Sequence, residues 1–323
     1  MPGAPLPAPT SPPEAAPGSA GRLWAAVHRA TAAIGRATHA SLDETRTTLG
    51  FIGELLQAVG RVGSGTLGGL LRRGRAGARS GHLQDAHARS HLPDAHARSH
   101  LRGADLLAQL EQSGPRSLPI VSLVSGLVGV ILAYMGAVQL QRFGAQTFIA
   151  DLVTIGAVRE VAALMTGVIL SGRIGASFAA QLGSMQANEE IDALRALGVD
   201  PMEHLVLPRV LGLVLVAPLL TAYAALVAVL AGGLVASLIF GVPAEQYAYK
   251  ALQSLTLTHV LVGLGKGTVY GLLVALAGCR QGLHAGRSAQ AVGQAVTASV
   301  VQAIVWIVVA ASALTVALQR LGW

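Results

Sequence analysis

One stretch of about 23 residues, Leu118–Leu140, has no charged side chain and lies between Arg116 and Arg142. As an α-helix that rises about 1.5 Å per residue, it is long enough to cross a hydrocarbon core of roughly 30 Å. We therefore predict a transmembrane helix here, and the rest of the chain has to be compatible with a bilayer.

The composition agrees with a membrane protein. The 323 residues are 52% hydrophobic and 12% charged, whereas soluble domains carry about a quarter charged residues. The net charge of +7 with 4% aromatics favours positive charge on the cytoplasmic side over a nucleic-acid partner. The single cysteine, Cys279, excludes an internal disulfide and a Cys-based zinc site.

Four further spans are expected, at about 152–182, between Arg209 and Glu245, at about 255–279, and between Arg287 and Arg320. The predicted fold class is thus all-α, a polytopic membrane protein with about five transmembrane helices. The chain opens on a Pro/Ala-rich segment without a signal-peptide h-region. We therefore expect a cytoplasmic N-terminus, which places the C-terminus on the outer, periplasmic side.

Three regions precede the membrane domain. Residues 1–41 are interpreted as a disordered Pro/Ala-rich tail. Residues 42–77 are interpreted as an amphipathic interfacial region, although a soluble helix packed on a neighbour stays open. This interpretation rests on the helical spacing of Leu49, Ile52, Leu55, Leu56 and Val59.

Residues 78–103 form a linker that contains a tandem repeat, DAHARSHL at 85–92 and again at 94–101. In a helix, its histidines would form i,i+4 pairs that can hold a metal. Pro93 between the copies would break such a helix, and two exact copies indicate a recent duplication. We therefore favour a solvated linker and expect no metal site.

The second predicted span has a small residue at every fourth position, which makes one smooth stripe for close helix packing in lipid. The stripe includes Gly167, Ser171, Gly175, Ala179 and Gly183.

A short amphipathic helix is expected directly after this span, within residues 184–201. Asn188 is its expected N-cap, and Gly198 followed by Asp200-Pro201 is its stop signal. The helix is predicted to dock into a groove on a partner protein, with a helix that rests on lipid headgroups as the alternative. Its apolar side comprises Ala187, Ile191, Leu194 and Leu197.

Three segments together carry a family resemblance: 172–201 preceded by Arg159-Glu160, then 261–282, then 286–301. In this order they resemble the MlaE/YrbE family of ABC permeases, the membrane subunits of Mla- and Mce-type lipid-trafficking systems. The resemblance runs over 104–323, which we take as the permease domain. Some relatives carry an N-terminal STAS domain, but residues 1–103 lack the alternating strand and helix pattern it needs.

The resemblance implies a homodimeric permease in the bacterial inner membrane that moves phospholipid or a related hydrophobic molecule to or from the cell envelope. It also implies two ABC ATPase subunits that bind ATP-Mg, an MCE-domain substrate-binding protein, and in some systems a STAS-domain protein. The chain itself has no G-x-x-x-x-G-K-[ST] motif, so it is expected to be no enzyme and to hold no cofactor. The ATPase contact would fall on the coupling helix, at Glu189, Glu190, Ile191, Asp192, Leu194 and Leu197.

Arg159, Glu160 and Lys266 are ionisable residues inside predicted spans, where a charge costs on the order of 2.5–3.5 kcal/mol or more. Neighbours in a helix point about 100° apart, so Arg159 and Glu160 are poor partners for each other. The resemblance places the Arg-Glu pair at a lipid-binding cavity, and Lys266 either contacts a lipid phosphate or pairs with Glu160. Contacts that only hold helices together are the alternative.

The chain departs from the family pattern at three positions of the permease domain. Ala162-Ala163 replaces a common Gly-Pro, Gln181 a common Glu, and Ala311 a common Asp. An ion-coupled secondary transporter is the alternative function, but its inverted repeats and broken helices are not evident in the sequence. No motif of an intramembrane enzyme stands in a span.

Overall fold

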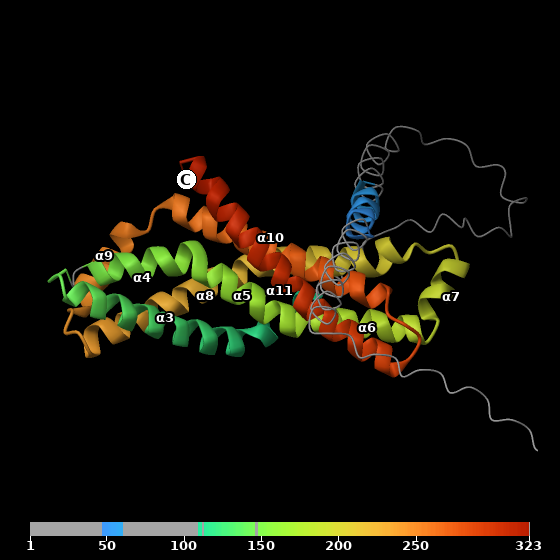
Figure 1. The fold of residues 1–323 in the computed structure, drawn as a ribbon, viewed down its shortest axis with the longest axis horizontal. Coiled ribbons are helices and arrows are strands. Elements are labelled where there is room, and N and C mark those ends of the chain that lie inside the picture. Colours follow the sequence, from blue (N-terminus) through green and yellow to red (C-terminus); the bar gives the residue numbers. More distant parts are fainter. Residues whose placement is uncertain (1–46, 61–108, 112, 146–147, 323) are drawn as a thin grey trace, which may run out of the picture. The chain divides into compact units, whose positions relative to one another are not determined.

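The structure is a computed structural model that describes residues 47–60, 109–111, 113–145 and 148–322. The predicted tail (1–41) and repeat linker (78–103) lie outside these residues. Every regular element in the described part is helical (Figure 1), as the predicted all-α class requires.

A helix over 47–60 lies within the predicted amphipathic region 42–77. Its buried side chains are Phe51, Leu55 and Ala58. Leu49 and Leu56, which the predicted apolar face included, are exposed. Its position at a membrane surface stays a prediction.

Five helices of the described part are long and apolar enough to cross a membrane, which confirms the predicted number. After a short 3₁₀ turn, η2 (Pro115–Ser117), the membrane-domain elements follow in this order: α3 (Leu118–Gln141), α4 (Ile149–Gly156), η4 (Ala157–Val161), α5 (Ala162–Leu170), η5 (Ser171–Gly175), α6 (Ala176–Ala187), α7 (Glu190–Ala196), η6 (Met202–Val206), α8 (Leu207–Leu238), α9 (Ala244–Ser254), α10 (Leu257–Leu283) and α11 (Ala289–Arg320).

The second span is one continuous helical run, Ile149–Ala187, of 39 residues. The π-helical segments η4 and η5 interrupt its α-helical geometry without breaking it. At 1.5 Å per residue the run is about 58 Å long, almost twice the thickness of a hydrocarbon core. One end must therefore protrude from the membrane, and α7 follows directly on α6.

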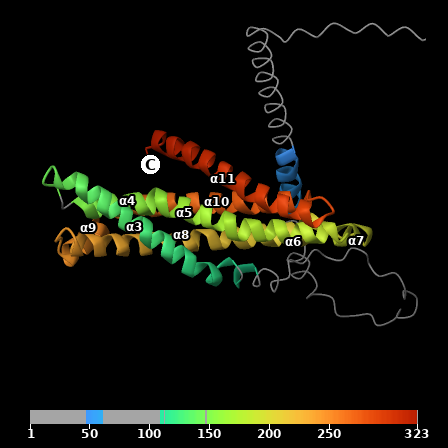
Figure 2. The same ribbon diagram turned by 60° about the horizontal axis from the view of Figure 1, so that its bottom comes forward.

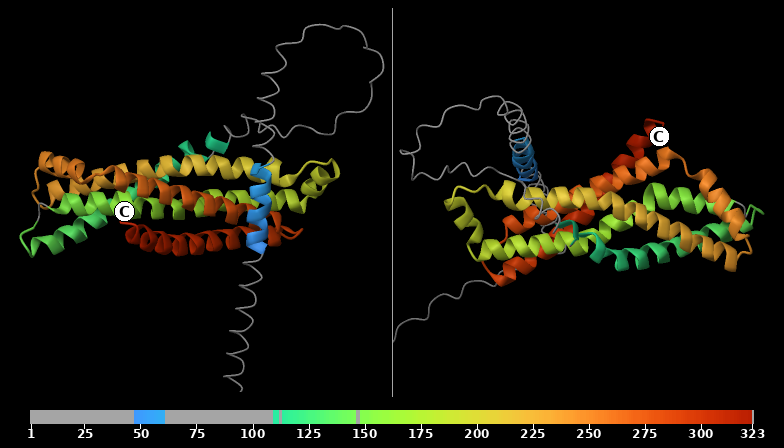
Figure 3. Two further views of the ribbon diagram at one scale, coloured as in Figure 1. Left: turned by 90° about the horizontal axis from the view of Figure 1, so that it is seen from above. Right: turned by 180° about the vertical axis from the view of Figure 1, so that it is seen from behind.

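The long helices lie side by side in an up-and-down bundle, in which α10 packs against α5, α6, α8 and α11 (Figure 2). Close approach depends on glycine. A Cβ on Gly129 would lie 2.2 Å from the carbonyl oxygen of Ala228, and one on Gly278 would lie 2.6 Å from that of Gly175. Small residues allow this proximity, which stabilises helix pairs in lipid. α11 lies at the edge of the bundle, against α5, α6 and α10 (Figure 3).

The segment between α8 and α10 contains the helix α9, where the sequence indicated only a short excursion. Tyr247 of α9 packs over Gly233 of α8 and donates a hydrogen bond of 3.1 Å to the carbonyl of Val229. A tyrosine hydroxyl is protonated at physiological pH even at its ordinary pKa of about 10, and burial raises the pKa of Tyr247 to about 12. The hydroxyl is therefore a donor that holds α9 on α8.

Candidate functional site

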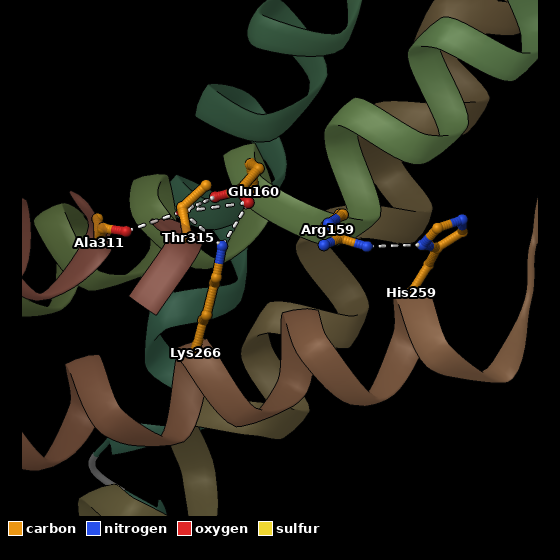
Figure 4. A network of polar contacts seen from close by, with 6 residues as sticks. All are labelled: Arg159, Glu160, His259, Lys266, Ala311 and Thr315. Carbon is orange, nitrogen blue, oxygen red and sulfur yellow. Dashed lines mark hydrogen bonds and ion pairs between the residues drawn. The ribbon is translucent and has the colours of Figure 1, made fainter. Parts of the chain in front are cut away.

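A cluster of polar side chains joins three membrane-spanning helices at Glu160, Lys266 and Thr315 (Figure 4). The Lys266 side chain is 1% exposed, and its ammonium group forms an ion pair with Glu160, which is 36% exposed. Lys266 also donates to Thr315 Oγ1 at 2.9 Å. The Thr315 hydroxyl lies 2.8 Å from the carbonyl of Ala311, to which it donates. The cluster therefore stabilises a buried cation with one carboxylate and one hydroxyl.

Arg159 points away from this cluster, toward the first turns of α10. Its Nη1 lies 3.3 Å from Nδ1 of His259 (Figure 4). Because Arg159 and Glu160 are neighbours in η4, their side chains leave the helix in different directions and meet different partners, as the helical geometry predicts. π-helical segments such as η4 are frequent at functional sites.

The structure thus brings Glu160 and Lys266 together and separates Arg159 from both. Sequence reasoning offered the Lys266–Glu160 pair as one of two possibilities and missed Thr315. A threonine in an apolar helix carries no signal of its own. Its position four residues after Ala311, on the same helix face, was the available hint, since Ala311 had been singled out as a departure.

A short helix, α7, lies where the coupling helix is predicted, but its start differs from the prediction. Asn188 is not its N-cap: the Asn188 N–H donates to the Ser184 carbonyl at 3.0 Å and closes α6. The chain then reverses at Glu189, which has a left-handed φ of 60°. The prediction was wrong because α6 extends to Ala187 and leaves only two residues for the turn.

The end of α7 follows the predicted stop signal. Gly198 has φ +75°, its N–H donates to the Arg195 carbonyl, and the N–H of Val199 donates to the Leu194 carbonyl. This pair of bonds is the Schellman motif. Asp200 Oδ1 then accepts from the N–H of Met202 at 2.9 Å and begins the helix that leads into α8.

The apolar residues of α7 do not share one exposed face. Ile191 is fully buried within the chain and Leu194 is half-buried, whereas Leu197 is 78% exposed. Arg287, between α10 and α11, pairs with Glu189 at 3.2 Å and with Asp192 at 3.0 Å. Ile191 and these ion pairs fix α7 to its own chain, which leaves Leu197 as the apolar side chain available to a partner.

Comparison with known proteins identifies the chain's relatives. The sequence model of the family described as permease MlaE matches residues 106–317. The chain belongs to the MlaE permease family. It is 33% identical to a probable ABC transporter permease protein of Rickettsia typhi, over 63% of this chain and 79% of that protein.

Further relatives of this MlaE permease include a probable ABC transporter permease protein of Synechocystis, 32% identical over 61% of this chain and 75% of the relative. The protein TRIGALACTOSYLDIACYLGLYCEROL 1, chloroplastic, of Arabidopsis thaliana is 31% identical over 63% of this chain and 58% of its own. An ABC transporter permease works with an ATPase partner, and this one is a multi-pass membrane protein.

The departures of this MlaE permease from the family pattern have local explanations. Ala162 and Ala163, in place of Gly-Pro, are buried and continue α5 directly after η4. Gln181, where the family resemblance leads us to expect Glu, accepts from Nη2 of Arg209 at 3.3 Å. Arg209 also lies 6.0 Å from the ring centre of Phe178, a cation–π distance.

The small-residue stripe of the second span lies against α10 and α11. A Cβ on Gly167 would come within 3.1 Å of Tyr270, one on Gly175 within 3.1 Å of Val274, and one on Gly183 within 3.2 Å of Val292. Ser171 and Ala179 are fully buried between them.

Proposed function

We propose that this MlaE permease is the membrane subunit of an ABC transporter that moves phospholipid or a related hydrophobic molecule between the bacterial inner membrane and the cell envelope. The observation that carries the proposal is the Glu160–Lys266–Thr315 cluster, a charged group held inside the membrane-spanning part of an ABC permease. Intramembrane charges are costly and mark substrate pathways. The Arabidopsis relative, named after a galactolipid, supports a lipid as the substrate class. In this proposal Arg159 and Glu160 contact the lipid, and Lys266, which is 1% exposed, acts through its ion pair with Glu160.

The proposed assembly is a homodimer with two ATPase subunits that bind ATP-Mg on the cytoplasmic side. An MCE-domain protein lies on the outer side, and a STAS-domain protein is a further candidate partner. The N-terminus is cytoplasmic and the C-terminus periplasmic. Of the five spans, α11 is the least covered by its own chain, which supports a second copy as its neighbour. Its exposed side chains include Val301, Val305, Val308, Val309 and Val316.

The proposal is tested by reconstituting the permease with its ATPase and MCE-domain partner in vesicles that contain a fluorescent phospholipid. We expect ATP-dependent transfer of the probe between vesicle and MCE-domain protein. Transfer driven by an ion gradient and independent of ATP would instead favour a secondary transporter.

Purified without partners, the permease should hydrolyse no ATP above the background of a mock purification, because its sequence lacks a phosphate-binding loop. A colourimetric phosphate assay on the detergent-solubilised chain measures this. Sustained hydrolysis by the chain alone would contradict the assignment of the nucleotide site to a partner.

The contact with the ATPase is tested by Leu197→Asp. Burying a leucine is worth roughly 1.5–3 kcal/mol, so losing it and burying a charge should weaken ATPase binding by at least about tenfold. Pull-down of the ATPase from detergent-solubilised membranes measures binding, and dimerisation serves as the folding control.

The matched control is Phe143→Asp, which changes a side chain that is 82% exposed in the turn after α3. It should leave ATPase binding unchanged. Wild-type recovery of the ATPase with Leu197→Asp would favour the alternative that α7 rests on headgroups. Ile191→Asp is unsuitable for this purpose, since Ile191 is buried within the chain and its replacement would destabilise the fold.

A further inference from the structure

A cavity of about 270 Å³ lies between α4, η4, α8, α9 and α10. No residue of α11 lines it, so it is separate from the place where Glu160 and Lys266 meet Thr315 of α11. Among the described residues that line it, only Thr154 and Thr221 carry polar side chains. Its wall is therefore almost entirely apolar.

The two threonines differ in a way that indicates a ligand. Thr221 donates to the carbonyl of Ala217 at 2.9 Å. Thr154 is 2% exposed, and its Oγ1 has no hydrogen-bond partner among the described residues. A buried hydroxyl without a partner is costly. Because Thr154 lines the cavity, rotation about its Cα–Cβ bond would present the covered hydroxyl to an acceptor on a bound molecule.

The cavity opens between side chains that face the bilayer. Leu226 of α8 and Leu252 of α9 are both exposed at its rim, and so is Ala222. Apolar cavities do not hold water well, and an opening in the membrane-spanning part admits hydrocarbon sideways. A group about the size of a water molecule occupies ~30 Å³. The cavity of about 270 Å³ therefore has room for about nine such groups, which corresponds to part of one acyl chain.

We propose that this cavity binds part of one acyl chain of a bilayer glycerolipid, with the Thr154 hydroxyl donating to the ester carbonyl of that chain. Val158 and Val260 line the cavity and are the sequence neighbours of Arg159 and His259. The binding of a lipid in this cavity does not depend on the proposed function. Its identity as the transport substrate does.

The test uses the full-length permease in phosphatidylcholine nanodiscs that contain a trace of ester-linked phosphatidylcholine with a photoactivatable diazirine in its acyl chain. After irradiation, labelled residues are mapped by mass spectrometry, and labels are expected within 221–229 and 251–264. Ala222→Trp fills the mouth of the cavity and should reduce this labelling at least fivefold. Leu219→Trp, a lipid-facing change on the same helix and outside the cavity, should leave it unchanged.

The hydrogen bond is tested by comparing nanodiscs made of ester-linked and of ether-linked phosphatidylcholine. An ether-linked lipid has no ester carbonyl to accept from Thr154. If Thr154 binds that carbonyl, ether-linked bulk lipid competes poorly with the ester-linked probe for the cavity, and labelling should be at least threefold higher than in ester-linked nanodiscs. Thr154→Val, which keeps the shape of the side chain, should abolish this difference. A difference that survives in Thr154→Val would overturn the role of Thr154, and labelling that Ala222→Trp does not reduce would overturn the site.

The outcome is separable from that of the proposed function. Labelling of the cavity in a complex that transfers no lipid would contradict the transport proposal alone. ATP-dependent transfer by a complex whose cavity is never labelled would contradict this inference alone. Elution of each variant at the wild-type volume in size-exclusion chromatography controls for folding.

Discussion

Gly263→Ala is expected to abolish accumulation of folded permease. A Cβ at this position would lie 2.0 Å from the carbonyl oxygen of Val158, a backbone atom that cannot rotate aside. Inserting one methyl group into a tight contact usually costs about 1–3 kcal/mol, and more where backbone has to move. Here α10 would have to separate from η4, which carries Arg159 and Glu160. We therefore expect a loss of at least ~3 kcal/mol.

Gly265→Ala is the matched control, two residues along the same helix. Its Cβ would have no neighbouring atom within 4 Å, and alanine is the better helix former by roughly 1 kcal/mol. This variant should be at least as stable as the wild type. Thermal unfolding of the detergent-solubilised chains, with the yield of the size-exclusion peak, measures both. If the two variants unfold at the same temperature, α10 and η4 are not in contact at Gly263.

The membrane helices were predictable because their signal is local. The uncharged run Leu118–Leu140 corresponds to α3, and the charges around the other runs marked the remaining spans. The extent of the second helix was less predictable. Its last turns contain Gln181, Ser184 and Gln186, which are polar enough to suggest that the helix ends at the membrane surface. The helix instead continues to Ala187, and the expected cap at Asn188 was misplaced for the same reason.

The site was predictable only in part. The expense of a charge in lipid identified Arg159, Glu160 and Lys266, and helical geometry correctly separated the directions of the first two. Which atoms meet Glu160 depends on tertiary structure, since Thr315 lies 155 residues away. The cavity beside Thr154 has no sequence signal, because its wall consists of ordinary apolar residues from several elements.

Removal of either partner of the Lys266–Glu160 pair should lower the stability of the permease, and the two losses should differ in size. Removing one partner of a buried ion pair costs about 3–5 kcal/mol, because the other charge is left uncompensated. Glu160→Ala leaves the ammonium of Lys266, which is 1% exposed, without its carboxylate, and should destabilise the permease by roughly this amount. Lys266→Met leaves Glu160, which is 36% exposed and has the Thr315 hydroxyl as a donor at 3.3 Å, so its cost should be smaller.

The double variant Glu160→Ala with Lys266→Met distinguishes a substrate site from contacts that only hold helices together. It removes both charges, so its unfolding temperature should recover most of the loss seen in Glu160→Ala. If the pair binds lipid, ATP-dependent transfer in reconstituted vesicles should still be at least about tenfold below wild type, a difference of roughly 1.4 kcal/mol. A double variant that is stable and transfers lipid at the wild-type rate would show that the pair only joins α10 to η4. Because the stability measurement and the transfer measurement use the same protein preparation, a loss of transfer with recovered stability assigns the charges to the substrate pathway.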